Sequence, residues 1–384
     1  MLHHLHHHYH IPRLAGMTEL FWAHGIRGLA QSLVAIFIPI YLYQIGYSLT
    51  EVFVYMVCVG VFWLALLYPM MRLINRFGAT RLMAVSMLFN VAQFLLLLTL
   101  PDFGWPLWLI ALTPAFYTAI YWPAFRSSFS ANLAHRRTGR VVGAWSAIQT
   151  LAVGIAPAIG GAIATVYGIN ALYLVAIAMF FVAAWPLLTG PTFVRRRPFK
   201  ITWKKLWRYR ADGVANLAET YNDITLSQTW PLFVFFVIPT YAGVGALSSV
   251  IVLTSILVSL YVGRREETKG VRHYLREGTF INGIGQGLKL IVANVGHIFT
   301  VNFVSGVGYS LYLTSYNTRY YEKIEHNGLP YLFLMQIVSA LAWIVAFGGL
   351  LLLTLALPDL PPRTVLLVGI LAAVPMSFLI GKIR

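Results

Sequence analysis

The chain has 384 residues, of which 59% are hydrophobic and only 10% are charged, and its mean hydropathy is +0.72. Because soluble domains carry about 25% charged residues, this composition excludes a water-soluble globular protein and indicates one surrounded by lipid. The 28 Lys and Arg against 12 Asp and Glu give a net charge of +16. Cys58 is the only cysteine, which excludes an intramolecular disulfide.

Twelve apolar runs approach the roughly 20 residues that cross a bilayer as a helix. They lie at residues 18–43, 50–71, 80–100, 105–133, 141–166, 169–189, 214–241, 244–263, 276–296, 299–321, 330–357 and 364–382. No cleavage site follows the first run, so we expect it to be retained. The pattern predicts an all-α integral membrane protein with twelve transmembrane helices in two pseudo-symmetric six-helix bundles. The predicted divisions are a His-rich tail (1–17), a first bundle (18–189), a basic linker (190–213) and a second bundle (214–384).

The positions of the basic residues predict the orientation of the chain. Alternate loops and the two termini contain 24 of the 28 Lys and Arg, the opposite loops contain only Arg363, and three lie within predicted spans. Since cytoplasmic loops are enriched in Lys and Arg, we expect a multi-pass protein of the cell (inner) membrane with both termini in the cytoplasm. The charge is scattered over separate loops, which argues against nucleic acid as a partner.

The two halves resemble each other in sequence. With an offset of 200, Glu19 and Tyr41 fall on Glu219 and Tyr241, and with an offset of 191 Tyr121 falls on Tyr312. The matches follow the six-plus-six pattern of apolar runs. They favour a duplicated bundle, an architecture in which transporters place the solute site between the repeats.

Two short motifs resemble those of the major facilitator superfamily. The loop from Met71 to Arg81 is similar to the family's G-x-L-a-D-r-x-G-r-r, with Leu73, Arg76 and Gly78 matching and Asn75 in place of the Asp. Residues 154–161 are similar to its G-x-x-G-P-x-x-G-G motif, through Gly154, Pro157, Gly160 and Gly161. The resemblance implies two six-helix halves that move against each other. It also implies that the first, fourth, seventh and tenth spans line a central cavity.

The resemblance implies a charged latch on the cytoplasmic side, and this sequence departs from it. Asn75 and Asn132 stand where the family has acidic partners for Arg76. An amide accepts a hydrogen bond from Arg but not a charge-assisted one, which is about twice as strong. We therefore expect a weaker latch. The glycines of residues 154–161 predict a close helix-packing seam, with a gating role as the alternative.

Charges inside the predicted spans are candidates for function. Arg27 lies about 24 Å from the outer end of the first span, inside the hydrocarbon core. Asn216, Glu219, Thr220, Asp223 and Ser227 form one polar stripe on the seventh span. The family resemblance places this stripe opposite Trp22, His24 and Arg27. An Arg27–Asp223 pair is the sharpest hypothesis, either for proton coupling, for solute contact, or as a static link between helices.

Further residues complete the candidate solute and proton site. Lys289 lies about 16 Å into the ninth span if that span begins at Gly278, and we expect it to turn inward beside Gln286 and Asn282. Glu19 lies at the headgroup level. Aromatic and amide side chains that could wall a pocket, with core packing as the alternative, are Tyr117, Tyr121, Trp122, Trp145, Gln149, Tyr309, Tyr312, Tyr316 and Asn317.

The chain begins with six histidines among residues 3–10. Such a run can bind transition metals, but the spans lack a matching cluster of His and carboxylates, so we predict a solvated tail and no resident metal. A tail that senses or delivers metal is the alternative.

Taken together, these features predict a secondary transporter that moves a small solute by alternating access with proton coupling. We expect it to work as a monomer in the lipid bilayer without a cofactor. No nucleotide-binding loop or catalytic motif occurs in the sequence, so we expect neither an ATP-driven pump nor an enzyme. The alternatives are a transporter-shaped receptor or assembly factor without transport, and a metal-ion exporter.

Overall fold

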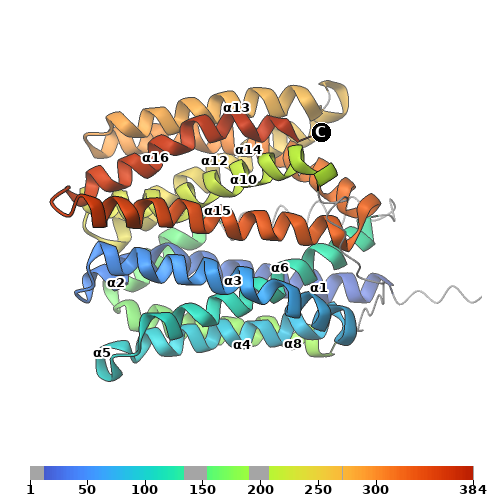
Figure 1. Ribbon diagram of the computed structural model, residues 1–384, viewed down its shortest axis with the longest axis horizontal. Helices are drawn as coiled ribbons and strands as arrows, with labels where there is room; N and C mark the ends of the chain where they lie inside the picture. The colour runs from blue at the N-terminus through green and yellow to red at the C-terminus, as the bar shows by residue number, and fades with distance from the viewer. Residues whose placement is uncertain (1–12, 134–153, 190–206, 270, 384) are drawn as a thin grey trace, which may run out of the picture.

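The computed structural model describes residues 13–133, 154–189, 207–269 and 271–383, and these residues form helices and short turns with no strand among them (Figure 1). Helices from the first half of the chain lie together on one side of the molecule, and helices from the second half lie on the other. The all-helical fold that the composition predicted is confirmed for the described residues.

The first half contains α1 (Arg13–Val34), a 3₁₀ turn (Ala35–Phe37), α2 (Ile38–Gln44), α3 (Leu49–Phe77), α4 (Ala79–Leu98), α5 (Leu100–Phe103), α6 (Leu107–Leu133), the helix Gly154–Val166 and α8 (Ile169–Thr189). A capping box starts α3, because the Ser48 hydroxyl accepts from Glu51 N while the Glu51 carboxylate accepts from Ser48 N. Gly78 ends α3 with a φ of 95°, which favours glycine.

The second half contains α10 (Arg210–Ile224), a π-helical turn (Thr225–Thr229), α11 (Trp230–Val237), α12 (Tyr241–Lys269), α13 (Val271–Leu288), a 3₁₀ turn (Lys289–Ile291), α14 (Val295–Asn327), α15 (Leu329–Ala356) and α16 (Pro362–Leu379). Seven of the described helical segments are long and apolar enough to cross a membrane. The more polar helices α10 and α13 carry buried side-chain hydrogen bonds, such as the one from Asn282 to Asn222.

Two helix boundaries differ from the predicted runs in ways that affect the site. The helix expected from Val214 begins at Arg210, since Arg210 and Ala211 are good helix formers and Asp212 suits the first turn of a helix, although their hydropathy is low. The run expected at 276–296 is instead α13, which begins at Val271 and ends at Leu288. The first turns of α13 carry Arg272, His273 and Arg276, so this helix begins before the predicted apolar run, and Lys289 follows its last turn. The depth of Lys289 in the membrane stays a prediction.

The bundle has two distinguishable ends. At the basic end, on the right in Figure 1, α3 and α14 end and α4 and α10 begin. Arg319 and Lys323 lie near this end of α14. At the opposite end lie the turn after α2 and the turn after α11. The run from Arg210 to Val237 is about 42 Å long, so it extends beyond a hydrocarbon core of about 30 Å.

The two halves touch at both ends of the bundle. At the opposite end, the rings of Tyr43 and Phe236 have centroids 5.0 Å apart. At the basic end, the rings of Phe129 in α6 and Tyr321 in α14 have centroids 4.9 Å apart. One aromatic contact at each end therefore joins the two halves, and the middle of α6, α10 and α14 lies between these contacts.

Glycines bring the helix Gly154–Val166 against α12 with no room for side chains. A Cβ on Gly161 would overlap the backbone carbonyl of Tyr241, and one on Gly245 would overlap the carbonyl of Pro157. Ser249 Oγ also accepts a hydrogen bond of 3.0 Å from Ala158 N. The close packing seam predicted from the sequence is present, and it joins the two halves of the chain.

Candidate functional site

Two carboxylates lie on one face of α10, at the middle of the molecule. Glu219 and Asp223 are four residues apart, so they occupy neighbouring turns of the same helix face. Asp223 lies about 20 Å from the start of α10 and about 21 Å from the end of α11. Both side chains are half-buried. The position is far from bulk water at either end of the run.

Each carboxylate has partners on neighbouring helices. Asp223 Oδ1 accepts a hydrogen bond of 3.2 Å from the Tyr309 hydroxyl of α14. Glu219 interacts electrostatically with Asp223 and with Arg126, which belongs to the other half of the chain. The pair thus joins α10 to both α14 and α6.

Arg126 is the cation that reaches across the interface. Its Nη1 donates a hydrogen bond of 2.9 Å to the Tyr320 hydroxyl of α14. Its guanidinium carbon lies 5.0 Å from the centroid of the Tyr320 ring and 5.3 Å from that of the Trp122 ring. Such contacts stabilise a cation by cation–π attraction, and they fix Arg126 between α6 and α14.

The predicted Arg27–Asp223 pair is absent from this structure. Arg27 is buried, with a side chain 6% exposed, and its guanidinium carbon lies 4.7 Å from the Tyr121 ring centroid and 5.0 Å from that of Trp122. The reason is geometric, because this face of α1 packs against α6 of its own half rather than against α10. Arg27 Nε finds no hydrogen-bond partner among the described residues.

His24 extends the aromatic wall of α6. Its Nδ1 lies 2.6 Å from the Tyr121 hydroxyl, and its ring stacks on Phe125 with centroids 3.9 Å apart. Trp22, on the same helix, is 50% exposed. The structure therefore brings His24, Arg27, Tyr121 and the Tyr117 ring together in the first half, whereas Trp22 points away from the buried part of this group.

Two amides of α10, Asn216 and Asn222, lie on either side of the carboxylates around the helix, and both are buried among the helices of their own half. Asn222 Oδ1 accepts hydrogen bonds from Asn282 Nδ2 at 2.8 Å, from Ser377 Oγ at 2.9 Å and from Gln286 Nε2 at 3.2 Å. Asn216 Nδ2 donates to the Met335 carbonyl and to Ser339 Oγ, both at 2.9 Å. The predicted single stripe is thus divided, because Asn216 and Thr220 contact Ser339 of α15 while Glu219 and Asp223 face the other half.

Lys289 is fully buried in the second half, one turn beyond Gln286. Its Nζ donates a hydrogen bond of 3.0 Å to Gln286 Oε1 and lies 5.0 Å from the centroid of the Trp230 ring. The Trp230 indole N–H in turn donates to Asn302 Oδ1 at 2.7 Å. The expected contact with Gln286 is confirmed. These contacts tie α13 to α11, and Gln286, which also donates to Asn222 Oδ1, links Lys289 to the residue beside Asp223.

The remaining predicted wall residues divide into core and interface. Tyr312 is fully buried beside Gly278, and the Tyr316 hydroxyl donates to Asn216 Oδ1 at 2.9 Å, so both belong to the core of the second half. Asn317 is half-buried on α14. Glu19, which was predicted at the headgroup level, has its Oε2 buried without a hydrogen-bond partner among the described residues. Trp145 and Gln149 lie outside the described residues.

The residues of the predicted gating motif lie apart from the carboxylates. Asn75 and Arg76 occupy the last turn of α3 at the basic end, where the Arg76 guanidinium carbon lies 5.3 Å from the Phe77 ring centroid. The side chain of Asn132 lies outside the described part. Gly154 faces Ile256, and Gly160 abuts the backbone of Leu33. A role in gating stays a prediction.

No group of three or more His, Cys, Asp or Glu side chains gathers to hold a metal ion in the part of the chain that the structure describes. The His-rich start at residues 3–10 lies outside that part.

Sequence reasoning missed two residues of the site. Hydropathy places Arg126 at the membrane margin. It is, however, the only Arg or Lys of α6, and its positive charge could have suggested Glu219 as its partner. Asn222 was not predicted because it lies outside the polar stripe of the seventh span and is uncharged. Its partners lie on α13 and α16, at separations of 60 and 155 residues.

Comparison with known proteins agrees with the fold. The sequence profile of the Major Facilitator Superfamily matches residues 20–382. A crystal structure of a variant of the nucleoside transporter NupG superposes with a TM-score of 0.67 at 11% identity, covering 96% of this chain and 99% of that one. No curated protein matches the sequence significantly.

The chain belongs to the Major Facilitator Superfamily, since the match covers nearly its whole length. It is a multi-pass membrane transporter of small solutes and not an enzyme. The likeness to NupG supports the fold and assigns no solute.

Proposed function

We propose that this protein is a secondary transporter of the cytoplasmic membrane that works by alternating access between two six-helix halves and couples solute movement to protons. The observation that carries the proposal is the carboxylate pair Glu219 and Asp223, half-buried on α10 and facing Arg126 of the other half. Intramembrane ionisable groups in such positions serve ion and substrate pathways.

The chemistry of the pair suits proton coupling. Two carboxylates one helical turn apart repel each other when both are ionised, and one shared proton removes that repulsion. Arg126 balances one negative charge while the halves are together. A movement that separates α6 from α10 would remove this balance. The proton would then bind more readily when the halves are apart, which links proton binding to conformation.

The contacts at the two ends support alternating access. Tyr43 touches Phe236 at the opposite end, and Phe129 touches Tyr321 at the basic end. Glu219 and Asp223 lie between these two contacts. Breaking one contact while the other is kept would expose the carboxylates to one side of the membrane at a time. The backbone contact of Gly161 with Tyr241 offers a fixed seam about which the halves could rock.

The walls beside the pair favour an organic solute with a flat ring and polar groups. His24 and Trp122 of the first half and Tyr309 of the second are half-buried near the interface. Aromatic walls with a few placed polar groups are typical of small-molecule sites. Because NupG, which shares the fold, is a nucleoside transporter, radiolabelled uridine and adenosine are the first probes.

The test measures solute and proton fluxes in proteoliposomes that contain the full chain. Entrapped pyranine reports proton influx, and radiolabelled probes report uptake with and without a pH gradient. We expect wild type and the exposed control Glu325→Gln to show coupled uptake, whereas Glu219→Gln loses the proton flux. Uptake that ignores the pH gradient in wild type would reject proton coupling, and the absence of uptake across a broad solute panel would favour a receptor or assembly factor.

A further inference from the structure

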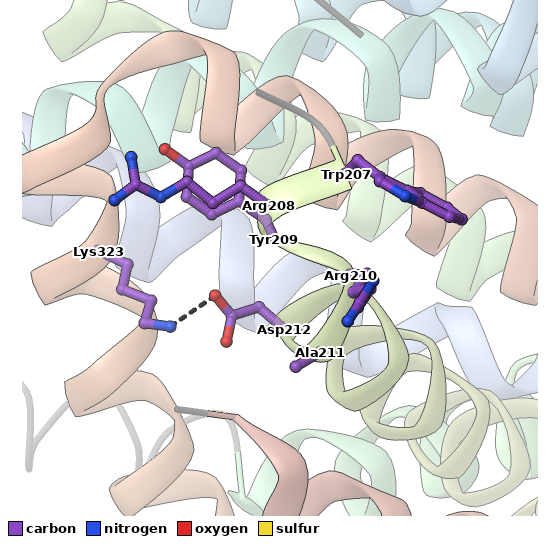
Figure 2. A pocket seen from close by; sticks show the side chains of 7 residues that line it. All are labelled: Trp207, Arg208, Tyr209, Arg210, Ala211, Asp212 and Lys323. Carbon is purple, nitrogen blue, oxygen red and sulfur yellow. Dashed lines mark hydrogen bonds and ion pairs between the residues drawn. The ribbon is translucent and has the colours of Figure 1, made fainter. Parts of the chain in front are cut away.

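A cavity of about 570 Å³ opens at the start of α10, at the basic end of the bundle (Figure 2). Its lining residues are Trp207, Arg208, Tyr209, Arg210, Ala211, Asp212 and Lys323. Figure 2 shows Lys323 of α14 facing Asp212 of α10 beside the cavity. The cavity lies well apart from the carboxylate pair, since Asp212 precedes Glu219 by about 10 Å along the helix.

Several contacts hold the first turn of α10 in place beside the cavity. Lys323 Nζ and Asp212 Oδ2 form an ion pair of 2.5 Å, and the Asp212 side chain is only 5% exposed. The Tyr209 hydroxyl donates to Asn327 Oδ1 at 2.8 Å, and the Tyr209 ring packs edge-on against Tyr331 with centroids 5.1 Å apart. The first turn of α10 is therefore held to the end of α14 by two separate contacts.

The lining has an excess of positive charge. Arg208, Arg210 and Lys323 face one acidic side chain, Asp212, which leaves a net charge of about +2 in the lining at neutral pH. Arg208 and Arg210 are exposed. An ammonium has three donors, so Lys323 retains hydrogen-bonding capacity beyond the pair with Asp212. The guanidinium groups suit phosphate oxygens, which they bind with two parallel hydrogen bonds.

The position of the cavity selects a lipid as the source of the phosphate. The run that begins at Arg210 exceeds the hydrocarbon thickness by about 12 Å, so its first turn lies at the headgroup level. Trp207 is 73% exposed at the same level, where tryptophan is enriched in membrane proteins. An acyl chain extending from a headgroup in the cavity would run along the apolar surface of the bundle.

We propose that this cavity binds the phosphate headgroup of an anionic phospholipid, with Arg208 and Lys323, which lie on one side of Asp212 in Figure 2, as ligands and with Arg210 on the other side adding positive potential. The lipid would hold the start of α10 against the end of α14. Since Glu219 and Asp223 follow on the same helix, the lipid composition of the membrane would influence the segment that carries the carboxylate pair. The proposal does not depend on proton coupling.

The test titrates a fluorescent short-chain phosphatidylglycerol into the purified full chain in neutral detergent, with the matching phosphatidylcholine as the comparison lipid. The test variant is Arg208→Gln with Arg210→Gln. The matched control is Arg81→Gln with Arg276→Gln, which removes two exposed cations outside the cavity. We expect phosphatidylglycerol affinity to fall about thirtyfold in the test variant only, as for two juxtamembrane cations. Gel filtration checks that both variants remain folded.

Three outcomes would overturn the proposal. Equal affinity of wild type and the test variant would show that the cavity residues do not bind the headgroup. Equal binding of phosphatidylcholine would show that charge is not recognised. Displacement of the probe by inorganic phosphate at the same concentration would identify a free anion, rather than a lipid, as the ligand.

Discussion

The amides and the carboxylates of α10 differ in how completely their side chains are satisfied. Asn216 and Asn222 are 2% and 1% exposed and use several donors and acceptors on four neighbouring helices. Glu219 and Asp223 are half-buried and have fewer fixed partners, with Tyr309 as the hydrogen-bond donor to Asp223. A satisfied amide network specifies packing, whereas partly exposed carboxylates at an interface remain free to exchange protons and partners.

The carboxylates should respond most strongly in transport. Asp223→Asn preserves size and one hydrogen-bond acceptor for Tyr309 but removes the charge, so we expect the thermal melting temperature to stay near that of wild type. Proton-coupled uptake should fall by about a hundredfold, within the usual contribution of a positioned proton-transfer group. Proteoliposome uptake and a melting curve on the same preparation measure both effects. Undiminished coupled uptake would remove Asp223 from the mechanism.

The amides should respond in stability instead. Asn222→Ala removes the shared acceptor of Asn282, Gln286 and Ser377, and buried donors left unpaired cost about 1–3 kcal/mol each. We expect a destabilisation of about 2–4 kcal/mol after partial rearrangement, seen as a lower melting temperature in detergent. The Asn222→Ala protein that remains folded should still show proton-dependent uptake. A variant as stable as wild type, yet unable to transport, would reverse the roles assigned to the amides and the carboxylates.

Substitution of Arg126 tests whether the carboxylates of α10 depend on a charge from the other half for coupled uptake. Arg126→Gln removes the charge facing Glu219 and the cation–π contacts, so we expect coupled uptake to fall about tenfold, in line with losing about 1–2 kcal/mol of such interactions. Tyr320→Phe, which removes the hydroxyl partner of Arg126 and keeps the ring, serves as the matched control. If both variants lose the same amount, the hydrogen bond rather than the charge is the contribution that matters.

Lys289 should give the smallest effect. Lys289→Met removes the cost of burying an ammonium but also the hydrogen bond to Gln286, worth about 1 kcal/mol. Because the two effects oppose each other, we expect stability to shift by less than about 1 kcal/mol. Transport should also be preserved, because Lys289 reaches α10 through Gln286 and Asn222, whose contacts lie within the second half. Loss of coupled uptake with unchanged melting would place Lys289 on the transport pathway.

Much of the architecture was predictable because the bilayer imposes a simple rule on composition. The apolar runs near 50–71 and 169–189 match α3 and α8 closely, since a lipid-facing helix must be apolar along its length. The boundaries of α10 and α13 were less predictable. Polar side chains are stable there only because neighbouring helices supply hydrogen-bond partners, and those partners are distant in sequence.

The candidate site was predictable in its residues but not in its pairings. Glu219, Asp223, Arg27 and His24 were all identifiable, because ionisable groups in apolar runs are conspicuous. The partners of Arg27 and His24 depended on which helix packs against their face of α1. Arg27 lies against Tyr121 and Trp122 of its own half, and Arg126 occupies the cross-interface place that the sequence suggested for Arg27.

The sequence by itself determined that this chain is an all-helical membrane protein with a charged seventh span, because hydrophobic length and the spacing of polar residues are local properties. Only the tertiary structure decided that the amides of α10 are satisfied within their own half while its carboxylates turn toward the other half. The physical reason is that a hydrogen-bond partner or counter-charge is chosen by the rotation and packing of whole helices.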